Sequence, residues 1–231
     1  MITTHLGNAI VRYDNVLDID KTYMSGFYER LNQINIGDNQ YTFSELEASK
    51  APQRFIELYN LPSDDQQFIE SLNDAIHKCV KQYIHLFPIL TQTLRWFTQG
   101  YIIKYENGQS IGPHSDCNIA YAEDGITPIN TFPIQNILTC GLLLNDEYEG
   151  GEVHYRPWGI TTKPSAGSVL IYPSSFVGCH EVNPVTAGVR YAYLMWYGHG
   201  PADHVKHDLV PDIRSINANQ GFVPVGQIAV N

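Results

Sequence analysis

The second half of the chain consists of short β-rich runs separated by Gly, Pro and Asn turns, and this spacing limits the folds that the chain can adopt. The runs cover residues 94–105, 135–144, 152–155, 168–172, 177–182 and 189–197. Short runs at such intervals are typical of an all-β sandwich or barrel. Because no helical segment alternates with them, we expect a sandwich or barrel here and not βαβ units.

The residues before this β-rich half carry a helical signal. Between Ser63 and Pro88 the apolar side chains step by three and four positions, which predicts one long amphipathic helix that ends before Pro88. Ser63 and Gln66 have the spacing of a capping box at its start. Shorter helices are predicted over 23–34 and 52–59.

Helices followed by strands predict one α+β unit in which the helices support a β core. A chain of 231 residues has the length of one domain. We expect mainly helical support at 1–91, the β core at 92–199 and an extended arm at 200–231.

Charge and composition narrow the function classes. The chain has 14 Lys and Arg against 24 Asp and Glu, a net charge of −10, so we expect no nucleic-acid partner. The sequence contains no apolar run near the roughly 18 residues of a membrane helix, and Met1–His5 lack the basic residues of a secretory leader. The four cysteines form no Cys-x-x-Cys pair, which predicts reduced thiols and a cytoplasmic protein.

A His-x-Asp pair is the first candidate for a metal-binding site. His114 and Asp116 would point to the same side of an extended strand and could bind one metal ion together, although such a pair alone is also common on polar surfaces. His180, in a short β-rich run, is the best candidate for a third ligand. Two His and one carboxylate on one face of an octahedron are typical of non-haem Fe(II) oxygenases.

Arg190 is the second candidate, ten residues after His180 and beyond the turn-rich segment 183–188. If the turn centres on Val185, Arg190 lies opposite His180 on the neighbouring strand. A guanidinium inside a barrel needs an anionic partner, and the sequence offers no obvious acidic residue there. We therefore expect an anionic ligand.

These residues resemble a known family. His114-x-Asp116, His180 and Arg190, followed by Tyr191-Ala192 and Trp196-Tyr197, are similar to the Fe(II)/2-oxoglutarate-dependent dioxygenases, in their prolyl 4-hydroxylase-like branch. The strand before the first ligand, a Gly-Gly-Glu hairpin and the strand before the distal His also match, at residues 101–109, 145–153 and 166–173. The similarity extends from Leu94 to Tyr197.

The resemblance implies a double-stranded β-helix, or jelly roll, with Fe(II) bound by the His-Asp-His set. It implies that 2-oxoglutarate chelates the iron while its far carboxylate pairs with Arg190, that O2 takes the last position, and that ascorbate is a candidate reductant. Tyr105 matches a position that lines the cosubstrate pocket, and Trp196 matches an aromatic wall beside the metal. Leu143 departs from the pattern of the family, because relatives often have Tyr at this position. This difference puts the cosubstrate affinity and the shape of the pocket in doubt.

The activity implied is hydroxylation of a C–H bond, with a peptidyl proline as the first substrate candidate and a free amino acid or other small molecule as the second. A non-catalytic metal-holding binding module is the contrasting hypothesis. A nucleic-acid demethylase is disfavoured, since such relatives usually have a second Arg six positions after the first, where this chain has Trp196. Asp116 argues against the related halogenases, which have a small residue at this position.

Two segments are candidates for substrate contact. The long connection 117–135, with Tyr121, resembles the mobile substrate lid of the family. Trp158 lies in a second aromatic loop, where core packing is the alternative. We expect the other histidines to be structural or surface residues, and we expect Cys117 and Cys179 to be inert thiols turned away from the metal.

Overall fold

The computed structural model describes residues 1–34, 51–94, 96–98, 100–117, 135–199 and 222–224. Its helices are α1 (Lys21–Leu31) and α3 (Ser63–Leu86), with short 3-10 turns η1 (Leu58–Asn60), η2 (Pro88–Gln92), η3 (Arg156–Trp158) and η4 (Phe176–Gly178). Its strands are β1 (Ile2–Gly7), β2 (Ile10–Asp14), β3 (Gln53–Phe55), β4 (Trp96–Thr98), β5 (Tyr101–Tyr105), β6 (Ile111–His114), β7 (Gln135–Leu143), β8 (Tyr148–Gly150), β9 (Val153–Tyr155), β10 (Ile160–Thr162), β11 (Val169–Pro173), β12 (His180–Val182), β13 (Val185–Gly188), β14 (Arg190–His199) and β15 (Phe222–Pro224).

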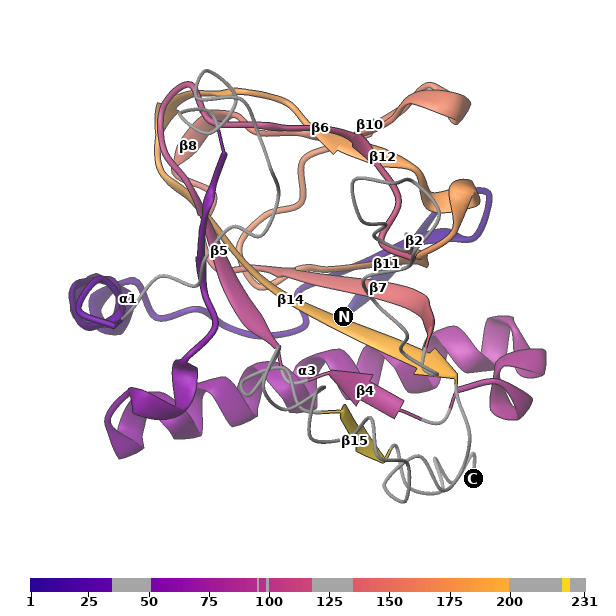
Figure 1. Cartoon of the computed structure of the whole chain (residues 1–231), viewed down its shortest axis with the longest axis horizontal. Coiled ribbons are helices and arrows are strands. Elements are labelled where there is room, and N and C mark those ends of the chain that lie inside the picture. The colour runs from indigo at the N-terminus through magenta and orange to yellow at the C-terminus, as the bar shows by residue number, and fades with distance from the viewer. Residues whose placement is uncertain (35–50, 95, 99, 118–134, 200–221, 225–231) are drawn as a thin grey trace, which may run out of the picture.

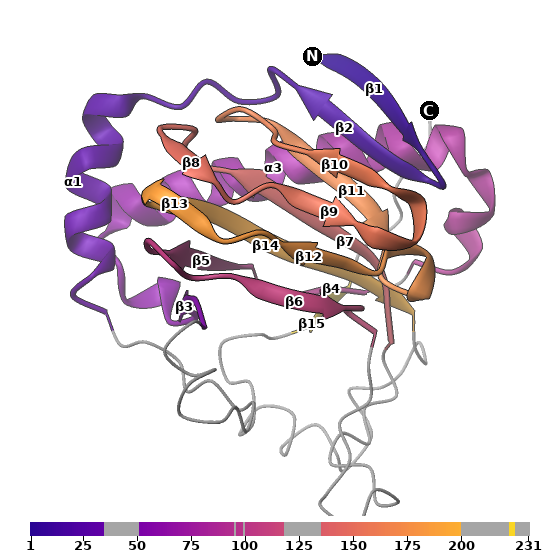
Figure 2. The ribbon, with the colours of Figure 1, turned by 90° about the horizontal axis from the view of Figure 1, so that it is seen from above.

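The strands form two main antiparallel sheets. The large sheet has the order β1-β2-β11-β7-β14-β4-β15, with β5 also paired to β14 and β3 paired to β5. The small sheet has the order β10-β9-β12-β6, and β13 pairs with β8 beside it. The small sheet lies over one face of the large sheet, and α3 lies along the opposite face (Figures 1 and 2). This arrangement confirms the predicted α+β class with a jelly-roll core supported by N-terminal helices.

Helix α3 packs on the large sheet through the apolar side chains that the sequence spaces at three and four positions. Leu72, Ile76 and Tyr83 are buried in one cluster with Leu142 and Tyr193 of the sheet. Helix α3 ends at Leu86, as the proline at 88 predicts. The predicted capping box is wrong. Pro62 is the N-cap, and the Gln66 side chain donates to the carbonyls of Tyr59 and Leu61, because the preceding 3-10 turn brings those carbonyls within reach.

Alternate residues of β14 face opposite sides of the large sheet, as the two-residue strand period requires. Tyr191, Tyr193, Met195 and Tyr197 belong to the cluster on the α3 side. Ala192 and Trp196 face the small sheet, in a second cluster with Tyr101, Ile103, Tyr105, Leu143, Tyr148, Val182 and Val185. This second cluster, which we call the interior cluster, contains residues of β5, β7, β8, β12, β13 and β14 and fills the space between the sheets.

Two parts of the N-terminal segment differ from the prediction of mainly helical support at 1–91. Residues 2–14 form the hairpin β1–β2, which extends the large sheet by pairing with β11. Residues 53–55 form β3 on β5 where a helix was predicted over 52–59. Short isolated helices are marginal in water, so pairing at a sheet edge and burial of Phe55, which is 1% exposed, outweigh the local helical pattern. Of the predicted arm at 200–231, the described part is β15, which pairs with β4.

Candidate active site

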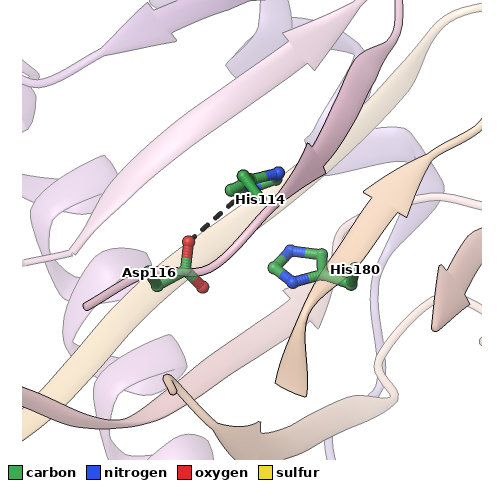
Figure 3. Close-up of side chains that lie close together, drawn as sticks. All are labelled: His114, Asp116 and His180. Carbon is green, nitrogen blue, oxygen red and sulfur yellow. Dashed lines mark ion pairs between the residues drawn. The ribbon is translucent and has the colours of Figure 1, made fainter. Parts of the chain in front are cut away.

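His114, Asp116 and His180 lie together at one end of the small sheet (Figure 3). Strand β12 pairs with β6 so that His180 is directly opposite His114, and Asp116 follows two residues after His114. One ligand atom from each residue lies within 4.8 Å of the others. The two imidazole centroids are 4.4 Å apart, and Nε2 of His114 is 3.5 Å from Oδ1 of Asp116. The fold therefore brings the three predicted ligands to one point.

Backbone carbonyls orient both imidazole rings. Nδ1 of His114 donates to the Gly112 carbonyl at 2.8 Å, and Nδ1 of His180 donates to the Gly178 carbonyl at 2.9 Å. A proton on Nδ1 leaves the lone pair of a neutral imidazole on Nε2. Both rings can thus offer Nε2 to a metal ion. In His180 this nitrogen accepts a hydrogen bond from the Tyr172 hydroxyl at 3.0 Å.

Hydrogen bonds fix both the side chain and the backbone of Asp116. The Thr139 hydroxyl donates to Oδ2 at 2.6 Å, and the Asp116 backbone N–H donates to the Ser174 carbonyl at 3.0 Å. Burial raises the pKa of Asp116, but the hydrogen bond from His114 and the charges of His180 and His114 lower it to about 2. Burial lowers the pKa of His180, and no neighbour fully offsets it. At neutral pH the site therefore presents one carboxylate anion and a neutral His180.

This donor set fits Fe(II). Two imidazole nitrogens and one carboxylate oxygen on one side of a metal ion leave positions open for ligands, as in non-haem Fe(II) oxygenases. A structural zinc ion would take a closed tetrahedron of four ligands, usually with cysteine. Cys117 and Cys179 are free thiols outside the cluster.

Arg190 is buried in the large sheet beside Tyr105. The two residues are opposite each other in the β14–β5 pairing, and the guanidinium carbon lies 4.9 Å from the Tyr105 ring centroid. Arg190 is only 4% exposed, and within the described residues its Nε has no hydrogen-bond partner.

The expectation that Arg190 lies opposite His180 is wrong. Strand β13 pairs with β8 and carries the chain from the small sheet to the large one, so that β12 and β14 are not neighbours.

The remaining predicted residues fall into three groups. Tyr105, Trp196 and Leu143 are buried members of the interior cluster, and Trp196 is opposite Thr139, the residue that donates to Asp116. Trp158 is 40% exposed, and its indole N–H donates to the Val177 carbonyl at 2.7 Å, which excludes the core-packing alternative. Tyr121 and most of the connection 117–135 lie outside the described residues.

The sequence reasoning missed three residues that the structure places in or beside the site. Tyr172 contacts His180, Thr139 contacts Asp116, and Tyr148 belongs to the interior cluster with Tyr105. Tyr172 and Thr139 are polar residues within apolar strands, and this was the available signal. Tyr148 gave no such signal, because it begins a strand of three residues.

Comparison with known proteins finds similarity to one enzyme superfamily over the β core. Residues 100–198 match the model of the 2OG-Fe(II) oxygenase superfamily. The β core of this chain is thus similar to that superfamily. A PKHD-type hydroxylase of Aliarcobacter butzleri is 37% identical over 97 residues, covering 40% of each chain. A PKHD-type hydroxylase of Acinetobacter baumannii is 32% identical over 126 residues, covering 51% of this chain and 52% of the relative. The chain thus matches about half, or less, of the length of these relatives.

Solved structures share the oxygenase fold at low sequence identity. A viral collagen prolyl hydroxylase from Paramecium bursaria Chlorella virus-1 has a TM-score of 0.56 at 15% identity, covering 84% of this chain and 98% of that one. A Pseudomonas putida prolyl-4-hydroxylase has a TM-score of 0.56 at 16% identity, with coverages of 84% and 94%. A Trichoplax adhaerens prolyl hydroxylase, solved with a hypoxia inducible factor peptide fragment, has a TM-score of 0.57 at 16% identity, with coverages of 87% and 88%. Among the described residues, no helix of this oxygenase fold has both the length and the apolarity to span a membrane.

Proposed function

We propose that this chain is an Fe(II)- and 2-oxoglutarate-dependent oxygenase that hydroxylates a C–H bond. The observation that carries the proposal is the convergence of His114, Asp116 and His180 in a fold that also buries the unpaired guanidinium nitrogen of Arg190. The hydroxylase names of the relatives support the reaction class.

Each residue has a role in this proposal. His114, Asp116 and His180 hold Fe(II), which when bound supplies, with O2 and 2-oxoglutarate, the oxidising power for hydroxylation. Arg190 pairs with the far carboxylate of 2-oxoglutarate, since a buried guanidinium is stabilised by a carboxylate. Tyr105 packs over the guanidinium, and the buried Trp196 forms an apolar wall that limits water.

Formation of succinate tests the activity. The purified protein with Fe(II), ascorbate and 2-oxoglutarate should release succinate, and His114→Ala should abolish the release. His154→Ala is the matched control, because His154 is a half-buried histidine outside the cluster, and its Nδ1 contacts Thr161 at 2.8 Å. Absence of succinate under all conditions, including with candidate substrates, would favour a non-catalytic binding module.

We propose a peptidyl proline as the substrate. The structural neighbours are prolyl hydroxylases, and one of them was solved with a peptide fragment. Tyr121 and the exposed Trp158 are the residues proposed to contact the peptide, and the bond from Trp158 to Val177 places its indole on the segment that leads into His180. Mass spectrometry of proline-containing peptides after incubation should show a gain of one oxygen atom. Oxidation of free proline or another small molecule instead would overturn the peptide assignment.

The domain division and location belong to the same proposal. We propose residues 92–199 as the catalytic core, 1–91 as its support and 200–231 as an arm. A cytoplasmic location is supported by the four free thiols, since a reducing compartment keeps cysteines unpaired. The net charge of −10 supports a partner other than nucleic acid.

A further inference from the structure

Tyr148 places a buried hydroxyl in the interior cluster. The residue begins β8, is 6% exposed, and shares the cluster with Tyr105 and Leu143. Within the described residues its hydroxyl oxygen has no hydrogen-bond partner. A buried polar group without a partner is destabilising, so a hydroxyl in this position implies a partner that binds there.

Arg190 and Tyr148 flank the same glycine. Gly151 has a φ of +65°, and a Cβ atom added to it would lie 3.0 Å from both Cδ of Arg190 and Cε2 of Tyr148. The absence of a side chain at Gly151 is thus what allows the two side chains to approach each other. The positive charge of Arg190 is close enough to oppose the rise that burial causes in the pKa of Tyr148.

The site therefore holds two unpartnered donors, Nε of Arg190 and the hydroxyl of Tyr148, in an environment of positive charge. Lys163 adds to this charge, because its Nζ lies 4.5 Å from the Tyr148 ring centroid and donates to the Tyr148 carbonyl at 2.6 Å. No ion pair among the described residues includes Arg190, so no acidic side chain of that part of the chain occupies the site. A carboxylate has two acceptor oxygens and can satisfy both donors at once.

We propose that Tyr148 is a carboxylate-recognition residue that acts together with Arg190 on the far carboxylate of the dicarboxylic keto acid. This inference rests on the proposed function. It also explains how the chain can have Leu143 where relatives often have a tyrosine. The phenol hydroxyl that such a tyrosine would supply comes here from Tyr148 of β8. Tyr148 thus selects a dicarboxylic over a monocarboxylic keto acid.

The test compares two keto acids on the full chain loaded with Mn(II), which binds to the same oxygen and nitrogen ligands. Calorimetric titration measures 2-oxoglutarate, which has the far carboxylate, and 2-oxobutyrate, which lacks it. Tyr148→Phe should weaken 2-oxoglutarate binding about tenfold, as expected for a hydrogen bond to a charged group, and leave 2-oxobutyrate binding unchanged. An equal loss for both keto acids, or no loss for 2-oxoglutarate, would overturn the inference.

Tyr155→Phe is the matched control. Tyr155 is also a buried tyrosine whose hydroxyl has no partner within the described residues, but its ring packs on Tyr172 and His180 and not on Arg190. This variant should keep the preference for 2-oxoglutarate. Failure of the unaltered protein to bind 2-oxoglutarate would overturn the proposed function as well, whereas normal binding with an unaffected Tyr148→Phe variant would overturn only the role of Tyr148. Both variants remove a single unpartnered hydroxyl, so the melting temperature should stay close to that of the unaltered protein.

Discussion

The hydroxyl of Tyr172 lies 3.0 Å from Nε2 of His180, the imidazole nitrogen that points toward the other two candidate ligands. Because Nδ1 of His180 donates to the Gly178 carbonyl, Nε2 carries the lone pair and is the acceptor of the tyrosine proton. A metal ion needs the same lone pair. The hydroxyl and the metal therefore compete for His180.

Tyr172→Phe should consequently raise the affinity for a divalent metal ion. The hydrogen bond lost from the metal-free protein contributes roughly 0.5–1.5 kcal/mol, which corresponds to about a 2- to 12-fold change. Competition titration with Mn(II) and a fluorescent chelator measures the affinity, with Tyr155→Phe as the control. A weaker affinity would show that the hydroxyl helps to hold the metal.

Thr139→Val should have the opposite effect. The Thr139 hydroxyl donates to Oδ2 of Asp116 at 2.6 Å, and so it orients the carboxylate while leaving Oδ1 to face His114. Loss of such a supporting hydrogen bond typically lowers metal affinity about 10- to 100-fold. The same titration with Mn(II) measures this loss of metal affinity. Thr162→Val is the control, because Thr162 is a buried threonine that contacts Arg12, and this variant should keep the metal affinity unchanged.

Arg190→Ala should raise the 2-oxoglutarate concentration required for turnover while the metal stays bound. A charge-assisted hydrogen bond contributes about 1.5–3 kcal/mol, so KM for 2-oxoglutarate should rise about 10- to 150-fold. Initial succinate rates across a range of 2-oxoglutarate concentrations, together with metal analysis of the purified variant, check both statements. An unchanged KM would remove Arg190 from the cosubstrate site.

Asp65→Asn should destabilise the contact between α1 and α3. The Asp65 carboxylate is 1% exposed and accepts from Arg30 Nε and Nη2, both at 2.6 Å, and from the Tyr23 hydroxyl at 2.7 Å. Arg30 lowers the pKa of Asp65 more than burial raises it. Because Arg30 is 40% exposed, we expect a loss of only about 1.5 kcal/mol at pH 7.

The pH dependence of this effect has a defined sign. A carboxyl group whose folded pKa lies below its unfolded value of about 3.9 contributes its stability above pH 4 and loses it as the pH falls through the folded pKa. Urea unfolding should therefore show a larger stability difference between the two proteins at pH 7 than at pH 3. Asp64→Asn, at the exposed neighbouring carboxylate, should change little at either pH. An equal difference for Asp65→Asn at both pH values would contradict the ion-pair explanation.

Features that depend on neighbouring residues could be predicted from the order of amino acids alone. The three- and four-residue spacing of Leu72, Ile76 and Tyr83 defines the buried face of α3, and two-residue alternation separates the two faces of β14. Alternation along an extended strand also indicated that His114 and Asp116 act on one side. Each of these patterns lies within a window of a few residues, where the period of the backbone decides which side chains share a face.

Long-range packing sets which distant segments of the chain meet. The pairing of β12 with β6 places His180 opposite His114, and the strand β13 moves Arg190 into the other sheet. The hairpin at 2–14, the hydroxyl of Tyr172 and the position of Tyr148 beside Arg190 depend on similar long-range contacts. Such contacts are set by how two sheets and a helix bury their apolar faces together. No short stretch of sequence contains both partners, and a strand of three residues is too short to show a period.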